Sequence, residues 1–155
     1  MKIRLITVGK LKESFWKEAV QEYIKRLQAY AKIEIEEVED ERIEKSLSNE
    51  QIKEKEGERI LSKIKPHDFV VLLDLKDAKT YDSVQFSNVL QQWIGKSYLT
   101  FVIGGSLGLG ENIRARGDER WSLSPLTFPH GLTRILVLEQ IYRAFKIAHH
   151  ETYHK

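Results

Sequence analysis

A glycine-rich segment in the last third of the chain has the residue types of a ligand-binding loop. An apolar run, Phe101-Val102-Ile103, opens into Gly104-Gly105-Ser106-Leu107-Gly108-Leu109-Gly110. We call residues 104–110 the glycine loop. Glycine has no side chain, so such a loop lets a ligand come close to the backbone. The loop lacks the Gly-Lys-Ser/Thr ending of a phosphate-binding loop, and the next predicted strand ends without the acidic residue of a dinucleotide site. A tight strand-to-helix turn explains the glycines alone equally well.

A second loop follows closely and adds polar groups beside apolar ones. It reads Leu123-Ser124-Pro125-Leu126-Thr127-Phe128-Pro129, and we call residues 123–129 the proline loop. Hydroxyls and backbone beside leucine and phenylalanine suit an adenine-like or thioether-bearing ligand better than a polyphosphate. Two such loops close in sequence predict one shared pocket.

Further candidate residues lie at the two ends of the last predicted helix. His130 follows the proline loop, where a histidine is either a packing residue or a catalytic one. The final residues, Tyr153-His154-Lys155, combine an aromatic ring, an imidazole and a cation, which together can contact a nucleobase or a phosphate. The adjacent His149 and His150 point apart and have no further ligands nearby in sequence, so we expect no metal site.

The elements that must position these residues alternate between strands and helices. Apolar spacing predicts strands at residues 2–8, 33–38, 69–73, 98–103 and 121–123, and helices at 14–27, 48–64, 82–93, around 113 and at 131–146. Ser48 with Gln51, and Asp82 with Gln85, have the spacing of capping boxes, and Pro66 should stop the second helix. This order predicts an α/β fold with a mainly parallel sheet flanked by helices.

The predicted sheet brings the candidate pocket residues to one edge. The continuous apolar run at residues 69–73 is typical of a central parallel strand covered on both faces. Ligands of open parallel sheets bind at the carboxyl ends of the strands, where Leu73, Gly104 and Leu123 lie. Asp74, one residue further, is most simply a turn residue.

Bulk composition limits the classes of protein. The chain has 155 residues, 41% hydrophobic residues, no cysteine and a net charge of +2, which predicts one domain, residues 1–155, without disulfides or thiolate chemistry. Neither a signal peptide nor a membrane span is apparent, so we expect a cytoplasmic protein. Basic residues gather at both ends of the sequence, which suits a nucleic-acid partner, although solvated surface charge explains them as well.

The last predicted helix is apolar around most of its circumference. Its own sheet can cover only one side, so a second copy of the chain is the economical partner for the other. Glu139 and Arg143 are spaced to pair at the edge of that contact.

At these residues the sequence resembles the SPOUT methyltransferases, and within them the bacterial ribosomal RNA large subunit methyltransferase H family. The likeness covers the whole chain and is carried by Ile6-Thr7-Val8-Gly9-Lys10-Leu11-Lys12, Glu54-Lys55-Glu56-Gly57-Glu58-Arg59-Ile60-Leu61, Ile103-Gly104-Gly105, Leu126-Thr127-Phe128-Pro129-His130, Glu139-Gln140-Ile141-Tyr142-Arg143-Ala144-Phe145 and Tyr153-His154-Lys155.

The resemblance implies S-adenosylmethionine-dependent methylation of N3 of a pseudouridine in large-subunit 23S rRNA, on assembled ribosomes and without a metal. It also implies a C-terminal trefoil knot and a homodimer with its active site across the interface. The implied cofactor positions are Leu73, Gly104, Gly105, Leu123, Ser124, Pro125, Leu126, Thr127 and Phe128. The implied substrate-side residues are His130, Tyr153, His154 and Lys155.

Several points remain open at the level of sequence. His130 or His154 can act as the base that removes the N3 proton, or either can orient the nucleobase. Lys155 or Arg143 can steady negative charge on a carbonyl oxygen. Two other classes also fit the chain: a non-catalytic ribosome-associated binding module, and a nucleotide-binding enzyme of another type.

Overall fold

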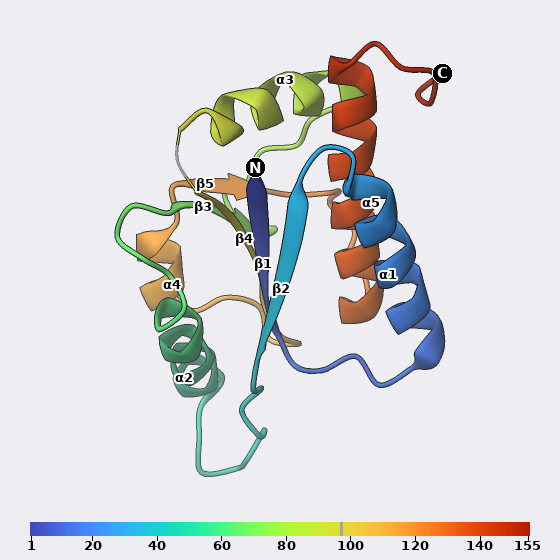
Figure 1. Ribbon diagram of the computed structural model, residues 1–155. Coiled ribbons are helices and arrows are strands. Elements are labelled where there is room, and N and C mark those ends of the chain that lie inside the picture. Colours follow the sequence, from blue (N-terminus) through green and yellow to red (C-terminus); the bar gives the residue numbers. More distant parts are fainter. Residues whose placement is uncertain (97) are drawn as a thin grey trace.

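The computed structural model describes residues 1–96 and 98–155, and within them five parallel strands form one sheet (Figure 1). The strands lie in the order β2-β1-β4-β3-β5. Their bounds are Lys2–Val8 for β1, Lys32–Val38 for β2, Phe69–Leu73 for β3, Leu99–Ile103 for β4 and Glu119–Trp121 for β5. β2, in which glutamates alternate with isoleucines, lies at an edge of the sheet, where the glutamates can face solvent.

Helices cover both faces of this sheet (Figure 1). They are α1 (Ser14–Leu27), α2 (Asn49–Leu61), α3 (Ser83–Ile94), α4 (Glu111–Arg116) and α5 (His130–Ala148). α5 packs against α1 and α3 on one face, while α2 packs against α4 on the other. The alternation of side chains along each strand fills two cores: Leu5, Val71 and Phe101 point to the α5 side, and Ile6, Leu72 and Val102 to the α2 side. The predicted α/β architecture is therefore confirmed.

Local sequence signals explain where α2 and α3 begin. Both predicted capping boxes form: the Ser48 and Asp82 side chains accept hydrogen bonds from the backbone N–H of Gln51 and Gln85. Two boundary predictions were wrong. α2 ends at Leu61 rather than at residue 64, with Ser62 in the C-cap position, and the last strand is Glu119–Trp121 rather than residues 121–123. β5 begins earlier because it pairs with residues 71–73 of β3.

The carboxyl ends of β4, β3 and β5 lie side by side because these strands are neighbours. β5 also has a contact on its outer side, where Lys79 forms a parallel bridge with Trp121. The Lys79 N–H donates to the Arg120 carbonyl at 3.0 Å, and the Ser122 N–H donates to the Lys79 carbonyl at 2.9 Å. β5 thus lies between β3 and a later part of the segment that follows β3.

α5 runs from the carboxyl edge of the sheet to the opposite end of the molecule, where the C-terminus lies (Figure 1). Its inner side is buried, through Val137, Leu138, Ile141 and other residues. Leu132, Leu136 and Ile147 remain partly exposed on the side that α1 and α3 leave uncovered. Among the described residues, no helix is long and apolar enough to cross a membrane.

Candidate functional site

A cavity of about 700 Å³ lies where the ends of β3, β4 and β5 meet. The glycine loop, the proline loop and the start of α5 line it, together with the segment after β3. The predicted residues in its wall are Leu73, Gly104, Gly105, Leu123, Ser124, Leu126, Thr127, Phe128 and His130. Pro125 is exposed and lies outside the lining. The two loops therefore line one cavity.

Close packing beneath the glycine loop explains why it lacks side chains. A Cβ atom at Gly104 would lie 2.9 Å from Leu109 Cδ2 and 3.1 Å from the carbonyl carbon of Gly108. A Cβ at Gly105 would lie 3.1 Å from both Glu56 Oε1 and Val8 Cγ1. Gly108 has φ +88°, in the region that favours glycine. Glycine is thus required both by the turn and by the tight support behind it.

The proline loop is shaped by its own serine side chains. The Ser122 hydroxyl donates to the Ser124 carbonyl at 2.8 Å, and the Ser124 hydroxyl accepts from the Leu126 N–H at 3.0 Å. Buried Trp121 lies directly before this turn and also lines the cavity. The loop therefore presents backbone groups and the hydroxyl of Thr127 beside apolar walls, which is a surface suited to a purine or a thioether.

Asp74 lines the cavity but its carboxylate is already engaged. Arg114 Nε and Nη2 donate to its two oxygens at 2.9 and 3.2 Å, and the Leu75 N–H donates at 2.8 Å. This hydrogen bonding raises the pKa of Arg114 above its usual value. Such a bidentate pair holds a loop in place, in agreement with the interpretation of Asp74 as a turn residue.

His130 is the first residue of α5, and one of its ring nitrogens is hydrogen-bonded. Arg134 Nε and Nη2 lie 3.2 and 2.5 Å from its Nε2 atom. Its Nδ1 atom is buried and makes no hydrogen bond of ordinary length to any described residue. Burial lowers the pKa of His130, the charge of Arg134 lowers it further, and the nearby backbone of Gly104 opposes the change. Burial and Arg134 thus both favour the neutral form of the ring.

Arg134 is the residue that the sequence analysis missed at this site. Its side chain is only 1% exposed. It donates to Glu37 Oε2 at 2.5 Å and to the Gly9 carbonyl at 2.7 Å, so it ties the start of α5 to the ends of β2 and β1. The only sequence signal was the spacing of four residues between His130 and Arg134, which places both on one helix face.

The C-terminal tail packs against the far end of α5. Tyr153 Oη donates to Glu139 Oε1 at 3.2 Å, and the Arg143 guanidinium lies 4.7 Å from the centre of the Tyr153 ring. Arg143 Nη1 is 3.1 Å from His154 Nδ1. The predicted Glu139–Arg143 pair is confirmed at 2.8 Å. Burial raises the pKa of Tyr153, and Glu139 adds to the increase, so its hydroxyl stays protonated.

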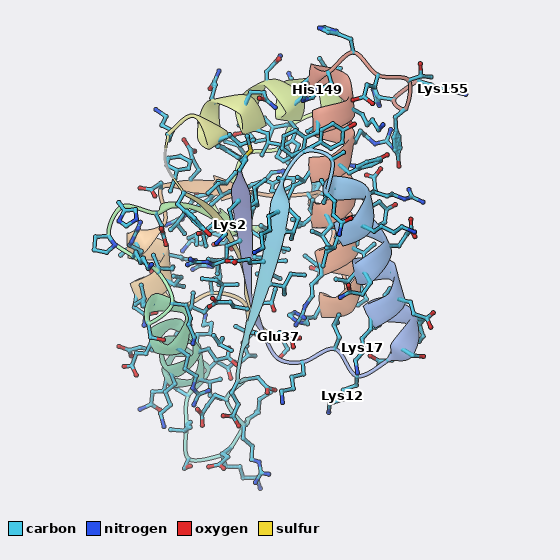
Figure 2. All side chains as sticks on the ribbon, in the orientation of Figure 1. Lys2, Lys12, Lys17, Glu37, His149 and Lys155 are labelled. Carbon is cyan, nitrogen blue, oxygen red and sulfur yellow. The ribbon has the colours of Figure 1, made fainter. Side chains whose placement is uncertain are left out.

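The structure does not bring the tail and His130 together within one chain. α5 has 19 residues, so its two ends lie roughly 28 Å apart. Lys155 is exposed at the top of the view in Figure 2, whereas Lys12, Lys17 and Glu37 mark the opposite end (Figure 2). Among the described residues no group of three or more histidine or acidic side chains is arranged to hold a metal ion.

Comparison with known proteins places this geometry in a family. A family model described as a predicted SPOUT methyltransferase matches residues 1–154. The chain belongs to the SPOUT methyltransferase family. Three bacterial proteins named ribosomal RNA large subunit methyltransferase H are similar over all of this chain and at least 99% of their own length. Their identities are 47% in Desulfitobacterium hafniense, 49% in Enterococcus faecalis and 50% in Ruminiclostridium cellulolyticum.

A solved structure supports the same fold assignment. The crystal structure of the A. aeolicus TrmH/SpoU tRNA modifying enzyme superposes with a TM-score of 0.51, covering 95% of this chain and 77% of that one. The identity is 12%, so the likeness concerns the fold alone. Together these matches confirm the family resemblance that the sequence motifs indicated.

Proposed function

We propose that this protein transfers a methyl group from S-adenosylmethionine to N3 of a pseudouridine in 23S rRNA of the large ribosomal subunit. The observation that carries the proposal is the cavity built from the glycine and proline loops, in a SPOUT chain that is 47–50% identical over its full length to ribosomal RNA large subunit methyltransferases H. The proposed reaction takes place in the cytoplasm, where the substrate is the assembled ribosome.

The cavity suits the proposed cofactor in size and in chemistry. About 700 Å³ lies within the range of small-molecule sites. Leu73, Leu123, Leu126 and Phe128 supply apolar walls for the adenine and the thioether. Backbone groups of the glycine and proline loops, with Ser124 and Thr127, supply hydrogen bonds, and Pro125 shapes the turn from outside.

Methyl transfer from a sulfonium mainly requires that the reacting atoms are aligned. The sulfonium is already an activated donor, so the protein must place N3, the methyl carbon and the sulfur in line. As the new N–C bond forms, the C–S bond breaks and the imide proton passes from N3 to a solvent water, giving S-adenosylhomocysteine and the methylated base. Tyr153, His154 and Lys155 are the proposed groups on the RNA side, with Lys155 or Arg143 stabilising charge on a carbonyl oxygen.

A homodimer would unite the two halves of this site. The tail lies at the far end of α5 from the cavity, roughly 28 Å away. The uncovered side of α5 carries Leu132, Leu136 and Ile147, which are apolar and only partly buried. If two α5 helices pack in opposite directions across this side, the tail of each chain reaches the cavity of the other.

A trefoil knot at the C-terminal end is part of the proposal. The support is the position of β5 between β3 and Lys79. Both neighbours precede β5 in the sequence, so earlier segments of the chain lie on both sides of it. The cavity would lie at the knot, where the crossing segments hold each other in place.

Two experiments test this function. Isothermal calorimetry should detect binding of S-adenosylmethionine and S-adenosylhomocysteine, and absence of both would contradict the proposal. Mass spectrometry of rRNA from cells with and without the gene should then differ by one methyl group on one pseudouridine. Cofactor binding with unchanged rRNA would instead favour a non-catalytic ribosome-associated module.

A further inference from the structure

We propose that Arg134 holds His130 as a brace for the glycine loop, so that His130 supports cofactor binding and does not act as the base of the reaction. The inference rests on the proposed function for the identity of the cofactor. It decides between the two roles that a histidine at this position can have, and it makes Arg134 a positioning residue.

The first step of the argument concerns the Nε2 atom of His130. An arginine side chain has only N–H donors and stays protonated at physiological pH. Arg134 Nε and Nη2 both point at Nε2, so Nε2 must accept the hydrogen bond with its lone pair. A neutral imidazole that accepts at Nε2 carries its proton on Nδ1. The lone pair that a general base needs is therefore already in use.

The second step concerns what fixes Arg134. Its guanidinium is held by the Glu37 carboxylate and by the Gly9 carbonyl at 2.7 Å, and the side chain is 1% exposed. These anchors come from the ends of two different strands. Because a guanidinium is planar and its donors have fixed directions, the contacts leave Arg134 little freedom to release His130.

The third step concerns the Nδ1 atom. It is buried without an ordinary hydrogen bond to any described residue, yet His130 and Gly104 line the same cavity. The backbone of Gly104 is also near enough to favour a proton on the ring. A buried N–H donor without a partner is costly, so we expect Nδ1–H to face the glycine loop and to bond to its backbone when the cofactor is bound.

A base and a brace predict different kinetic effects. Loss of a base lowers kcat and leaves cofactor affinity unchanged. Loss of a brace weakens cofactor binding and leaves kcat nearly unchanged once the cofactor is saturating. The two roles also respond differently to asparagine, whose amide N–H can stand in for Nδ1–H but which cannot accept a proton.

The test compares His130→Ala with His130→Asn in the full-length protein. We expect His130→Ala to raise the dissociation constant of S-adenosylmethionine about tenfold, which corresponds to one lost hydrogen bond. At saturating cofactor its kcat should stay within about threefold of the wild type, and His130→Asn should recover most of the affinity. If both variants lose kcat while their cofactor affinity stays intact, the proposal is wrong.

The protonation of the His130 ring provides an independent measurement. In a ¹⁵N spectrum of the wild-type protein at pH 7, the His130 ring should be the neutral form protonated on Nδ1. A ring protonated on Nε2, or a charged ring, would overturn the proposal.

Arg134→Lys should weaken cofactor binding in the same direction as His130→Ala. Since Arg134 is buried and its variant can misfold, Glu37→Gln serves as a second variant that keeps a hydrogen-bond acceptor for Arg134, and it should weaken cofactor binding less.

The outcomes separate this inference from the proposed function. If the wild-type protein binds no S-adenosylmethionine or S-adenosylhomocysteine, the function itself fails. If the wild type binds and methylates but His130→Ala behaves as a base mutant, only the brace fails.

Discussion

The two ends of α5 are built in contrasting ways. At the start of the helix, Arg134 connects His130 to the ends of two neighbouring strands, β1 and β2, and its side chain is 1% exposed. At the other end, Tyr153 and His154 contact Glu139, Tyr142 and Arg143 of the same helix, on its surface. Glu151 adds a contact to Tyr30 at 2.7 Å.

This contrast indicates a division of tasks between the two ends. The cavity end is part of the sheet, which suits the proposed cofactor site. The tail end is a surface attachment that few contacts hold, so it can be changed without harm to the fold. Changes at the two ends should therefore produce separable effects, on cofactor binding at one end and on methyl transfer at the other.

The largest expected effect comes from filling the glycine loop. Gly104→Val should reduce affinity for S-adenosylmethionine by at least about 100-fold, because even a Cβ there would lie 2.9 Å from Leu109 and 3.1 Å from Gly108. Calorimetry measures this directly. Gly95→Ala is the matched control, since its Cβ would meet its nearest neighbours at 3.5 Å, and it should bind normally. Normal binding by Gly104→Val would separate the glycine loop from the cofactor.

Removal of the tail should have the opposite pattern. Deleting residues 153–155 should reduce methyl transfer to ribosomes by about 100-fold or more, while the cofactor dissociation constant changes by less than about twofold. A filter assay of labelled methyl groups and calorimetry give the two numbers. A loss of cofactor affinity equal to the loss of activity would mean that the two ends are not separable.

Mixed dimers sharpen the same comparison. A chain with Gly104→Val has an intact tail, and a chain without residues 153–155 has an intact cavity. If the site forms across a dimer, combining equal amounts of the two inactive chains should restore about a quarter of the wild-type activity, because about half of the dimers are then mixed and each mixed dimer contains one complete site of two. If tail and cavity work within one chain, the mixture stays inactive.

Sequence patterns predicted those features of the cavity end that local signals determine, and they missed the long-range contacts. Capping boxes, apolar strands and loop glycines are local signals, so Gly104 and Leu123 could be assigned to neighbouring strand ends. Arg134 was missed because its partners Glu37 and Gly9 lie 97 and 125 residues away in sequence, and only the folded sheet brings them close. The shift of β5 to Glu119–Trp121 has the same kind of cause, since pairing with β3 decided it.

A smaller effect is expected from the support of the tail. Glu139→Gln removes the charge that Arg143 and Tyr153 share, so methyl transfer should fall about three- to tenfold with unchanged cofactor affinity. Glu22→Gln is a close control, because Glu22 pairs with Arg26 at the same spacing and the same 2.8 Å, and among the described residues it makes no hydrogen bond or ion pair with residues 153–155. Equal losses in both variants would show that helix charge, not tail support, is responsible.

The smallest effect concerns stability behind the glycine loop. Burial raises the pKa of Glu56, although the Glu41 N–H that donates to it at 3.0 Å and nearby Arg59 act against the increase. A carboxyl whose pKa is raised by folding binds its proton more tightly in the folded state, so stability falls as pH rises from about 4.5 through the folded-state value. Glu56→Gln should therefore raise Tm at pH 7 by about 2 °C, and the difference should vanish near pH 4, where the carboxyl is neutral. Exposed Glu54→Gln, two residues away, should leave Tm unchanged at both values. A lower Tm for Glu56→Gln at pH 7 would mean that the carboxylate stabilises the fold, and that the cavity end is held together by charge as well as by packing.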